Sequence, residues 1–148
     1  MERFDEGIRV LVRAISYAKE LGDDVKQKEY FDFYHKLSYS HVGIDIEYGS
    51  FLEKRNSLVE SESILAEIYE NNPSNVYAIF AYVKTLCAIN KYDVAKEIID
   101  NAYSNTEILL ENRNIIDSAN VHYLACKNEY SEAISILEKE INKDRKNI

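Results

Sequence analysis

The chain is poor in the two residues that most often interrupt helices and shape turns. It has 4 Gly and 1 Pro in 148 residues, well below the average usage of about 7% and 5%. A β-sandwich or β-barrel needs a turn signal at roughly every ten positions, and this sequence cannot supply so many. The scarcity excludes these all-β classes and predicts an all-α fold whose helices are joined by short connections.

Cysteines and long apolar runs are also scarce. The only cysteines, Cys87 and Cys126, are not spaced as a C-x-x-C pair, and isolated thiols of this kind are typical of a reducing compartment. No apolar run approaches the roughly 20 residues that a membrane-spanning helix needs. Residues 1–21 are too charged for a signal peptide. We therefore expect a cytoplasmic protein without membrane contact.

Positive charge is in the minority, with 18 Lys and Arg against 26 Asp and Glu and a formal net charge of −8. Such a surface repels the phosphate backbone of nucleic acids, and the sequence has no basic stripe to override this repulsion. The one basic cluster, at residues 143–146, is interpreted as cations that complement the negative end of a last helix. No nucleic-acid partner is expected.

The rest of the composition is that of an ordinary folded domain, with 46% apolar and 30% charged residues. A chain of this length buries roughly 70% of the surface that it exposes when unfolded. No linker, low-complexity tract or change in composition divides the sequence. We expect a single domain over residues 1–148.

Apolar residues recur at the three- and four-residue steps of helices along most of the chain. A first helix ends at Gly22, and a second helix is expected within residues 25–41. Over residues 42–48 the apolar residues alternate as in a β-strand, but a lone strand would have no partner for its backbone groups. We expect a helix there as well, and it remains open whether residues 24–56 form one long helix or two.

Helix boundaries are clearer beyond residue 50. Polar stop signals follow the apolar stripes at Asn71-Asn72-Pro73, at Asn90 and at Ser104-Asn105. These signals predict antiparallel pairing of residues 76–90 with 92–104, and of residues 112–127 with 130–143. Counted over the whole chain, seven or eight helices are expected.

One short phrase occurs four times: a bulky residue, two residues that are usually acidic or polar, and a small residue. The copies are Phe4–Gly7, Leu58–Ser61, Tyr92–Ala95 and Tyr130–Ala133. The small residues of the second and third copies are separated by about 34 residues, which is the period of a stacked helix-turn-helix array. A small residue at this position lets the second helix of a pair approach the first closely.

The residues around these phrases resemble the tetratricopeptide repeat, in which large residues mark the first helix of each pair and small residues the second. The best copy spans about residues 76–107, with Ile79, Tyr82, Val83 and Leu86 on its first helix and Ala95, Ile99 and Ala102 on its second. The flanking copies keep the nine-residue step from a leucine to the small residue, at Leu52 and Leu124. The resemblance implies antiparallel helix pairs stacked as a right-handed superhelix.

The sequence departs from a regular array at two places. The last copy follows the one before it at a distance that exceeds the repeat period by about one helical turn. The opening phrase reads as a second helix whose first helix is missing. The stretch between Gly7 and Ser61 is longer than one repeat, and it leaves room for an added helix around residues 24–45.

The family resemblance also implies a site. Members of this family bind peptides in a groove lined by their first helices, and one subgroup holds a C-terminal carboxylate with Lys, Arg and Asn. The corresponding positions in this sequence are Tyr77, Phe80, Lys84, Cys87, Ser118 and His122. Lys84 is the only cation among them, so the carboxylate clamp is absent and an apolar, aromatic groove is expected. Helical spacing alone does not decide whether Tyr77 and Phe80 line this groove or pack in the core.

No catalytic or metal-binding motif stands out. His35, His41 and His122 are scattered, none has a second His four residues away, and we identify no Cys or acidic residue that completes a ligand set. Nucleophile-elbow and phosphate-binding glycine motifs are absent. The Glu residues between positions 60 and 70 are interpreted as a solvated helix face. No metal, cofactor or enzymatic activity is expected.

The sequence thus predicts a non-enzymatic scaffold or adaptor that binds a protein or peptide. The alternatives are a small cytoplasmic chaperone or regulatory subunit that acts as a dimer, and an enzyme built on a helical bundle. A homodimer would form through the N-terminal helix, whose apolar residues lie on two sides: Ile8, Leu11 and Ile15 on one, and Val10, Ala14, Tyr17 and Leu21 on the other. The competing interpretation is that residues 24–45 fold back over the second side.

Overall fold

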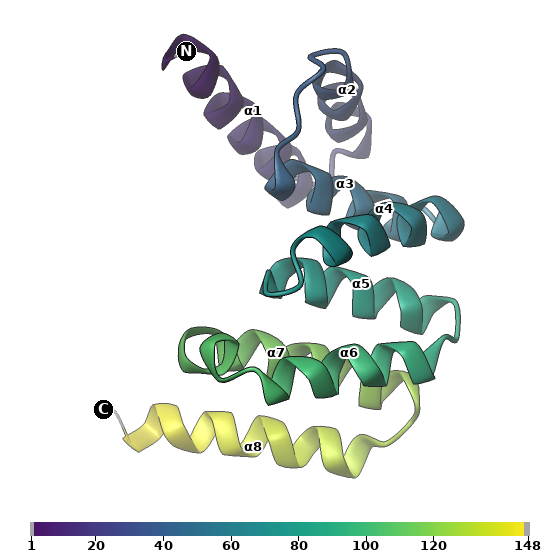
Figure 1. Ribbon diagram of the computed structural model, residues 1–148, viewed down its shortest axis with the longest axis vertical. Helices are drawn as coiled ribbons and strands as arrows, with labels where there is room; N and C mark the ends of the chain where they lie inside the picture. Colours follow the sequence, from purple (N-terminus) through teal and green to yellow (C-terminus); the bar gives the residue numbers. More distant parts are fainter. Residues whose placement is uncertain (1, 147–148) are drawn as a thin grey trace. The chain divides into compact units, whose positions relative to one another are not determined.

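The computed structural model describes residues 2–146, and within them the chain is entirely helical (Figure 1). Eight α-helices follow one another in this part of the chain: α1 (Glu2–Glu20), α2 (Asp24–His35), α3 (Val42–Lys54), α4 (Leu58–Asn71), α5 (Val76–Ala88), α6 (Tyr92–Ser104), α7 (Thr106–Cys126) and α8 (Tyr130–Lys146). The predicted all-α class and the expected number of helices are confirmed. None of these helices is both long enough and apolar enough to cross a membrane.

The chain forms two compact units, Met1–Tyr48 and Gly49–Ile148, and the boundary between them falls inside α3. In the first unit α1 packs against α2. The apolar stripe predicted for α1 runs from Phe4 to Ala18. Its members Ile8, Leu11, Ile15 and Ala18 are buried, whereas Phe4 is 44% exposed. From α2, Phe31 and Tyr34 complete this core.

The segment that alternates like a strand is helical. Helix α2 ends at His35 and α3 begins at Val42, so residues 24–56 contain two helices rather than one. Helix α3 runs through Gly49 without a break, and in the second unit it packs closely on α4. A Cβ atom added at Gly49 would lie 2.6 Å from Cγ of Leu65. Gly49 therefore has no side chain because the neighbouring helix occupies that space.

The same turn closes four of the helices. A residue with positive φ follows α1, α3, α5 and α7, and these residues are Gly22, Asn56, Asn90 and Asn128. The next residue donates its backbone N–H to the carbonyl five positions earlier, over 2.8–2.9 Å: Asp23 to Ala18, Ser57 to Leu52, Lys91 to Leu86 and Glu129 to Leu124. This is the Schellman arrangement, which satisfies the last carbonyls of a helix.

The spacing of these turns follows the repeat. The steps from Gly22 to Asn56 and from Asn56 to Asn90 are both about 34 residues, which is the period of the tetratricopeptide repeat. The step from Asn90 to Asn128 is longer by about one helical turn. The last turn is therefore displaced along the sequence by the same amount as the last copy of the repeated phrase, Tyr130–Ala133.

The turns set the register of the helix pairs. Helices α1, α3, α5 and α7 each come before such a turn and are hereafter the first helices, and α2, α4, α6 and α8 are the second helices. The expectation that α1 is a second helix without its partner is wrong, because α1 ends in this turn and packs against α2. The first pair was not recognised because the buried Gln27 stands where the other pairs have Ser61, Ala95 and Ala133.

In the second unit, the helices from α4 to α8 run back and forth in succession (Figure 1). Helix α5 packs against α4, α6 and α7, and α7 packs in turn against α6 and α8. The predicted pairs of α5 with α6 and of α7 with α8 are therefore confirmed. Direct packing of α5 on α7 also brings two successive first helices side by side.

The longer step from Asn90 to Asn128 is explained by the length of α7. Helix α7 has 21 residues, and Asn112 inside it adopts a non-helical conformation with φ −131° and ψ 22°. Helix α7 begins 22 residues before its turn residue Asn128, whereas α5 begins 14 residues before Asn90, so the additional residues lie at the start of α7, before this kink. The pair predicted as residues 112–127 and 130–143 thus begins at a bend within a longer helix.

Candidate functional site

Helix α5 presents one narrow stripe to solvent. Because α5 packs against three other helices, nine of its thirteen residues are buried. The four that remain accessible follow one another at three- and four-residue steps and therefore lie along one line of the helix: Tyr77, Phe80, Lys84 and Ala88. This set is hereafter called the α5 stripe. Tyr77 is the more open of the two aromatic residues, at 63% exposure, and Phe80 is half-buried.

Charged groups from the neighbouring first helices lie beside the α5 stripe. Nζ of Lys84 is 3.6 Å from Oε2 of Glu53, which lies in the last turn of α3. On the other side, α7 contributes the half-buried His122. Burial lowers the pKa of His122, the positive charge of Lys84 lowers it further, and Glu53 acts in the opposite direction. Three successive first helices thus place titratable side chains within electrostatic reach of one another.

The six residues predicted for the groove occupy different environments. Tyr77, Phe80 and Lys84 lie on the α5 stripe, and His122 lies close enough for Lys84 to act on its pKa. Ser118 is exposed on α7, and its hydroxyl donates to the carbonyl of Asn114 over 2.8 Å. Cys87 is only 3% exposed, so it does not belong to the accessible stripe.

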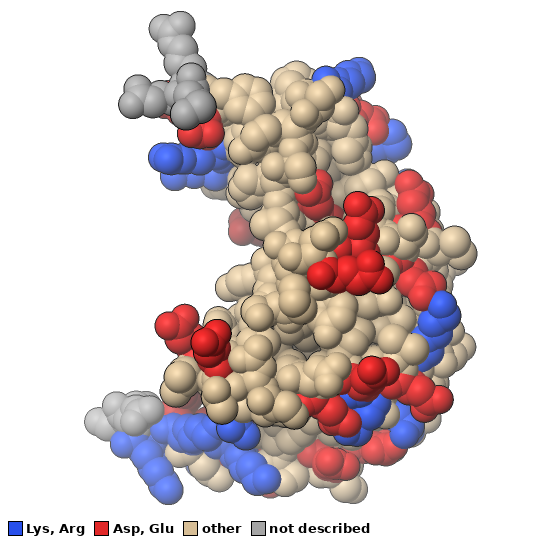
Figure 2. All heavy atoms as spheres, viewed as in Figure 1, with Lys and Arg blue, Asp and Glu red and all other residues tan. Residues whose placement is uncertain are grey.

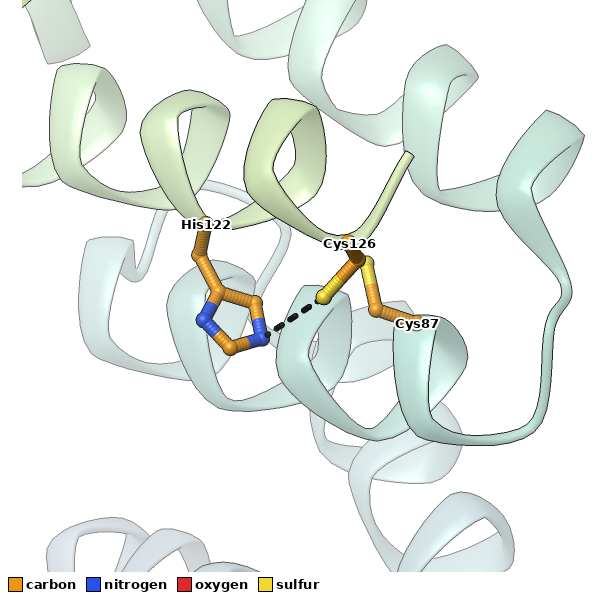
Figure 3. Close-up of side chains that lie close together, drawn as sticks. All are labelled: Cys87, His122 and Cys126. Atoms are coloured by element: carbon orange, nitrogen blue, oxygen red, sulfur yellow. Dashed lines mark hydrogen bonds between the residues drawn. The ribbon is translucent and has the colours of Figure 1, made fainter. Parts of the chain in front are cut away.

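Cys87 instead belongs to a cluster with His122 and Cys126 (Figure 3). The two sulfur atoms and a ring nitrogen of His122 all lie within 4.8 Å of one another. Sγ of Cys126 is 3.5 Å from Nε2 of His122. Burial, and then the neighbouring thiol of Cys126, raise the pKa of Cys87 to about 12. These side chains come from the last turns of α5 and α7, which are packed against each other.

This cluster contradicts the expectation that no Cys or acidic residue completes a ligand set with a histidine, because two cysteines lie beside His122. The available signal was the spacing of His122 and Cys126, four residues apart, which places both on the same face of a helix. Cys87 could be added only once the packing of α5 on α7 was known. The structure therefore assembles a set of three potential metal ligands that no sequence motif indicated.

The cluster occupies a position that recurs between the first helices. Glu53 lies three residues before its turn residue Asn56, and Lys84 lies six residues before Asn90. At the interface between α5 and α7, Cys87 lies three residues before Asn90, and His122 lies six residues before Asn128. Cys87 is therefore equivalent to Glu53, and His122 to Lys84. The contact between α3 and α5 is therefore an ion pair, and its equivalent between α5 and α7 is a thiol beside an imidazole.

A second polar region lies between α6, α7 and α8. A depression of about 630 Å³ is lined there by Tyr103, Arg113, Asp117, Asn120, Ile136, Lys139, Glu140, Asn142, Lys143 and Lys146. The hydroxyl of Tyr103 donates to the buried Asp117 over 2.6 Å, and burial followed by this hydrogen bond raises the pKa of Tyr103. Figure 2 shows Lys and Arg side chains gathered at the C-terminal end of α8. Because Asp117 is engaged by Tyr103, with Nε of Arg113 3.8 Å away, it serves as a structural anchor.

No protein-family model, curated protein or solved structure matches the chain.

Proposed function

We propose that the protein is a non-enzymatic, cytoplasmic scaffold that binds a protein or peptide along its first helices, in the manner of a tetratricopeptide-repeat protein. The observation that carries the proposal is the α5 stripe, where an otherwise buried helix keeps two aromatic side chains and one cation accessible. Large aromatic side chains contribute contact area at little cost in rotamer entropy, which favours them in binding surfaces.

Two features of the fold support this proposal. The turns after α1, α3 and α5 recur at the period of a stacked helical array. Helix α5 packs directly on α7, where the exposed Ser118 lies one helical turn before His122, and His122 is within electrostatic reach of Lys84. A ligand lying across both helices would contact Tyr77 and Phe80 with its apolar side chains. The charged side chains at Lys84 and Glu53 would then set its orientation.

The test begins with a peptide library displayed on phage and selected against the immobilised full-length protein. The affinity of a selected peptide is then measured for the wild type and for two variants, Tyr77→Ala and Phe80→Ala. Each variant is expected to weaken binding by about tenfold, because aromatic residues at the centre of an interface typically contribute more than about 1 kcal/mol. Urea unfolding confirms that both variants remain folded.

Tyr130→Ala is the matched control. Tyr130 is 56% exposed, similar to Tyr77, but it lies at the start of α8, which is a second helix. Its replacement should leave the affinity unchanged. If Tyr130→Ala weakens the selected peptides as much as Tyr77→Ala does, or if neither α5 variant changes the affinity, the first helices are not the binding surface.

A further inference from the structure

We propose that Cys87, His122 and Cys126 bind one zinc ion. The inference rests on the ligand atoms of these three residues and is independent of the proposed peptide binding. Thiolate and imidazole are the ligands that zinc takes most often in proteins, and a site with two Cys and one His is an established type of zinc site. Two thiolates also balance the double positive charge of the ion.

The distances between the ligand atoms suit a tetrahedral site. Zn–S and Zn–N bonds of about 2.3 and 2.1 Å place a sulfur and a nitrogen about 3.6 Å apart at tetrahedral angles, and two sulfurs about 3.8 Å apart. Sγ of Cys126 and Nε2 of His122 are 3.5 Å apart. All three ligand atoms lie within 4.8 Å of one another, so no distance between them exceeds its tetrahedral value by much more than about 1 Å.

The helices hold these ligands in place. His122 and Cys126 are one turn apart on α7, so they point to the same side of that helix (Figure 3). Cys87 reaches them from α5, against which α7 is packed. A site built on two packed helices needs little ordering when the ion binds, which favours affinity.

The chemistry of the ligands also selects the ion. Thiolates favour zinc and other soft ions, whereas magnesium and calcium take oxygen ligands. Zinc binds cysteine as the thiolate, so binding is coupled to the release of thiol protons to solvent.

Three protein ligands leave one position of a tetrahedral zinc ion open. His122 and Cys126 are half-buried, whereas Cys87 is buried. The ion would therefore be held from the inside by Cys87 and would have its fourth position toward the accessible side of α7. A water molecule, or a donor atom of a bound molecule, would complete the coordination there.

The repeat-equivalent positions support a specialised role for this interface. Between α3 and α5, these positions hold the ion pair of Glu53 with Lys84, which needs no metal ion. Between α5 and α7, the same two positions hold Cys87 and His122. Cys126 supplies a third ligand two residues before its turn residue, where α5 has Ala88. The three ligands thus occur together at one interface, whereas its equivalent holds none of them.

The experiment uses the full-length protein, free of any affinity tag, reduced with a phosphine and stripped of metal by a chelator. Zinc is titrated in competition with a chromophoric chelator, and cobalt(II) is then used as a spectroscopic substitute. We expect one zinc ion per chain, and a cobalt complex with thiolate-to-metal charge-transfer bands and the visible bands of tetrahedral coordination. Counting of free thiols before each titration confirms that both cysteines are reduced.

His122→Gln and Cys126→Ala are the test variants, because both residues are half-buried and their replacement should be compatible with folding. Each should weaken zinc binding by roughly 100-fold or more, since removal of a direct ligand exceeds the 10- to 100-fold effect of an outer-shell change. His35→Gln, which replaces an exposed histidine of α2, is the control and should bind zinc like the wild type.

Four results would overturn the proposal. The first is a reduced wild-type chain that binds no zinc at micromolar concentration. The second is a cobalt complex without charge-transfer bands from sulfur. The third is zinc binding that is unchanged in Cys126→Ala. The fourth is binding of copper(I) without binding of zinc or cobalt(II), which would reject the assignment to zinc. The wild-type measurements decide the question even if one of the variants does not fold.

Discussion

At the scale of single residues, Tyr34 is the hydrogen-bonding centre of the first unit. It is 2% exposed, and its hydroxyl donates to Oδ1 of Asp45 over 2.8 Å. The hydroxyl oxygen of Tyr34 also accepts a hydrogen bond from the backbone N–H of His41, over 2.6 Å. The other carboxylate oxygen of Asp45 accepts from the hydroxyl of Ser40. One phenol therefore ties α2 to the connection before α3 and to α3 itself.

We predict that Tyr34→Phe lowers the free energy of unfolding by about 1–3 kcal/mol, because the N–H of His41 and a carboxylate oxygen of Asp45 lose a buried partner. Urea unfolding at neutral pH measures the difference. Tyr39→Phe is a suitable control, because Tyr39 lies in the same unit and its side chain is exposed. A Tyr34→Phe variant as stable as the wild type would show that these hydrogen bonds contribute no net stability.

The same side chain predicts a dependence on alkaline pH. Burial raises the pKa of Tyr34 to about 12, whereas a tyrosine in the unfolded chain ionises near pH 10. The unfolded state therefore loses its proton first, and stability falls as the pH rises from about 10 to 12. Tyr82 and Tyr103 have pKa values shifted in the same direction, so Tyr34→Phe should reduce this loss without abolishing it. Urea midpoints measured across this pH range check the prediction, and equal slopes for both proteins would contradict it.

At the scale of elements, small residues decide how closely paired helices approach. Ala95 is fully buried on α6, which packs against both α5 and α7. We predict that Ala95→Leu destabilises the protein by about 1–3 kcal/mol or more, because the added atoms force these helices apart. Val94→Leu is the matched control, because Val94 precedes Ala95 on the same helix and is 41% exposed. Equal urea midpoints for Ala95→Leu and the wild type would rule out this close packing.

The ends of the elements were the most predictable part of the fold. Gly22, Asn90 and Asn72-Pro73 were recognised from local chemistry, because a positive φ or a missing N–H acts within a few residues. Pairing was predictable where a small residue marked the second helix. The prediction failed for the pair of α1 and α2, because a buried glutamine, Gln27, takes the position of the small residue.

The site was less predictable than the fold, for a physical reason. The family resemblance located the α5 stripe, because Tyr77, Phe80 and Lys84 follow one helical line. Whether each side chain is open or buried depends on the other helices, and Cys87 proved to be buried. The cluster of Cys87 with His122 and Cys126 joins residues of two different helix pairs. Contacts of that range are set by packing, and no local pattern encodes them.

At the scale of the whole molecule, α1 has exposed apolar side chains on the face opposite its buried stripe. Val10, Tyr17 and Leu21 are 62%, 68% and 75% exposed. Helix α2 packs against α1, yet these side chains remain open, so the interpretation that residues 24–45 cover the second side is wrong. A missing first helix no longer supports a dimer either, because α1 is itself a first helix. What supports self-association is the exposed apolar stripe.

We predict that the protein forms a homodimer through this face of α1, since a twofold dimer is the commonest way to bury a self-complementary apolar surface. Light scattering at micromolar concentration should give twice the 17.2 kDa of one chain. Tyr17→Glu and Leu21→Lys place charges on the exposed face without touching the buried stripe of Ile8, Leu11 and Ile15. Either change should therefore yield a folded monomer. If the wild type has the mass of a single chain at these concentrations, the dimer is excluded, and the exposed stripe of α1 is then available to a different partner.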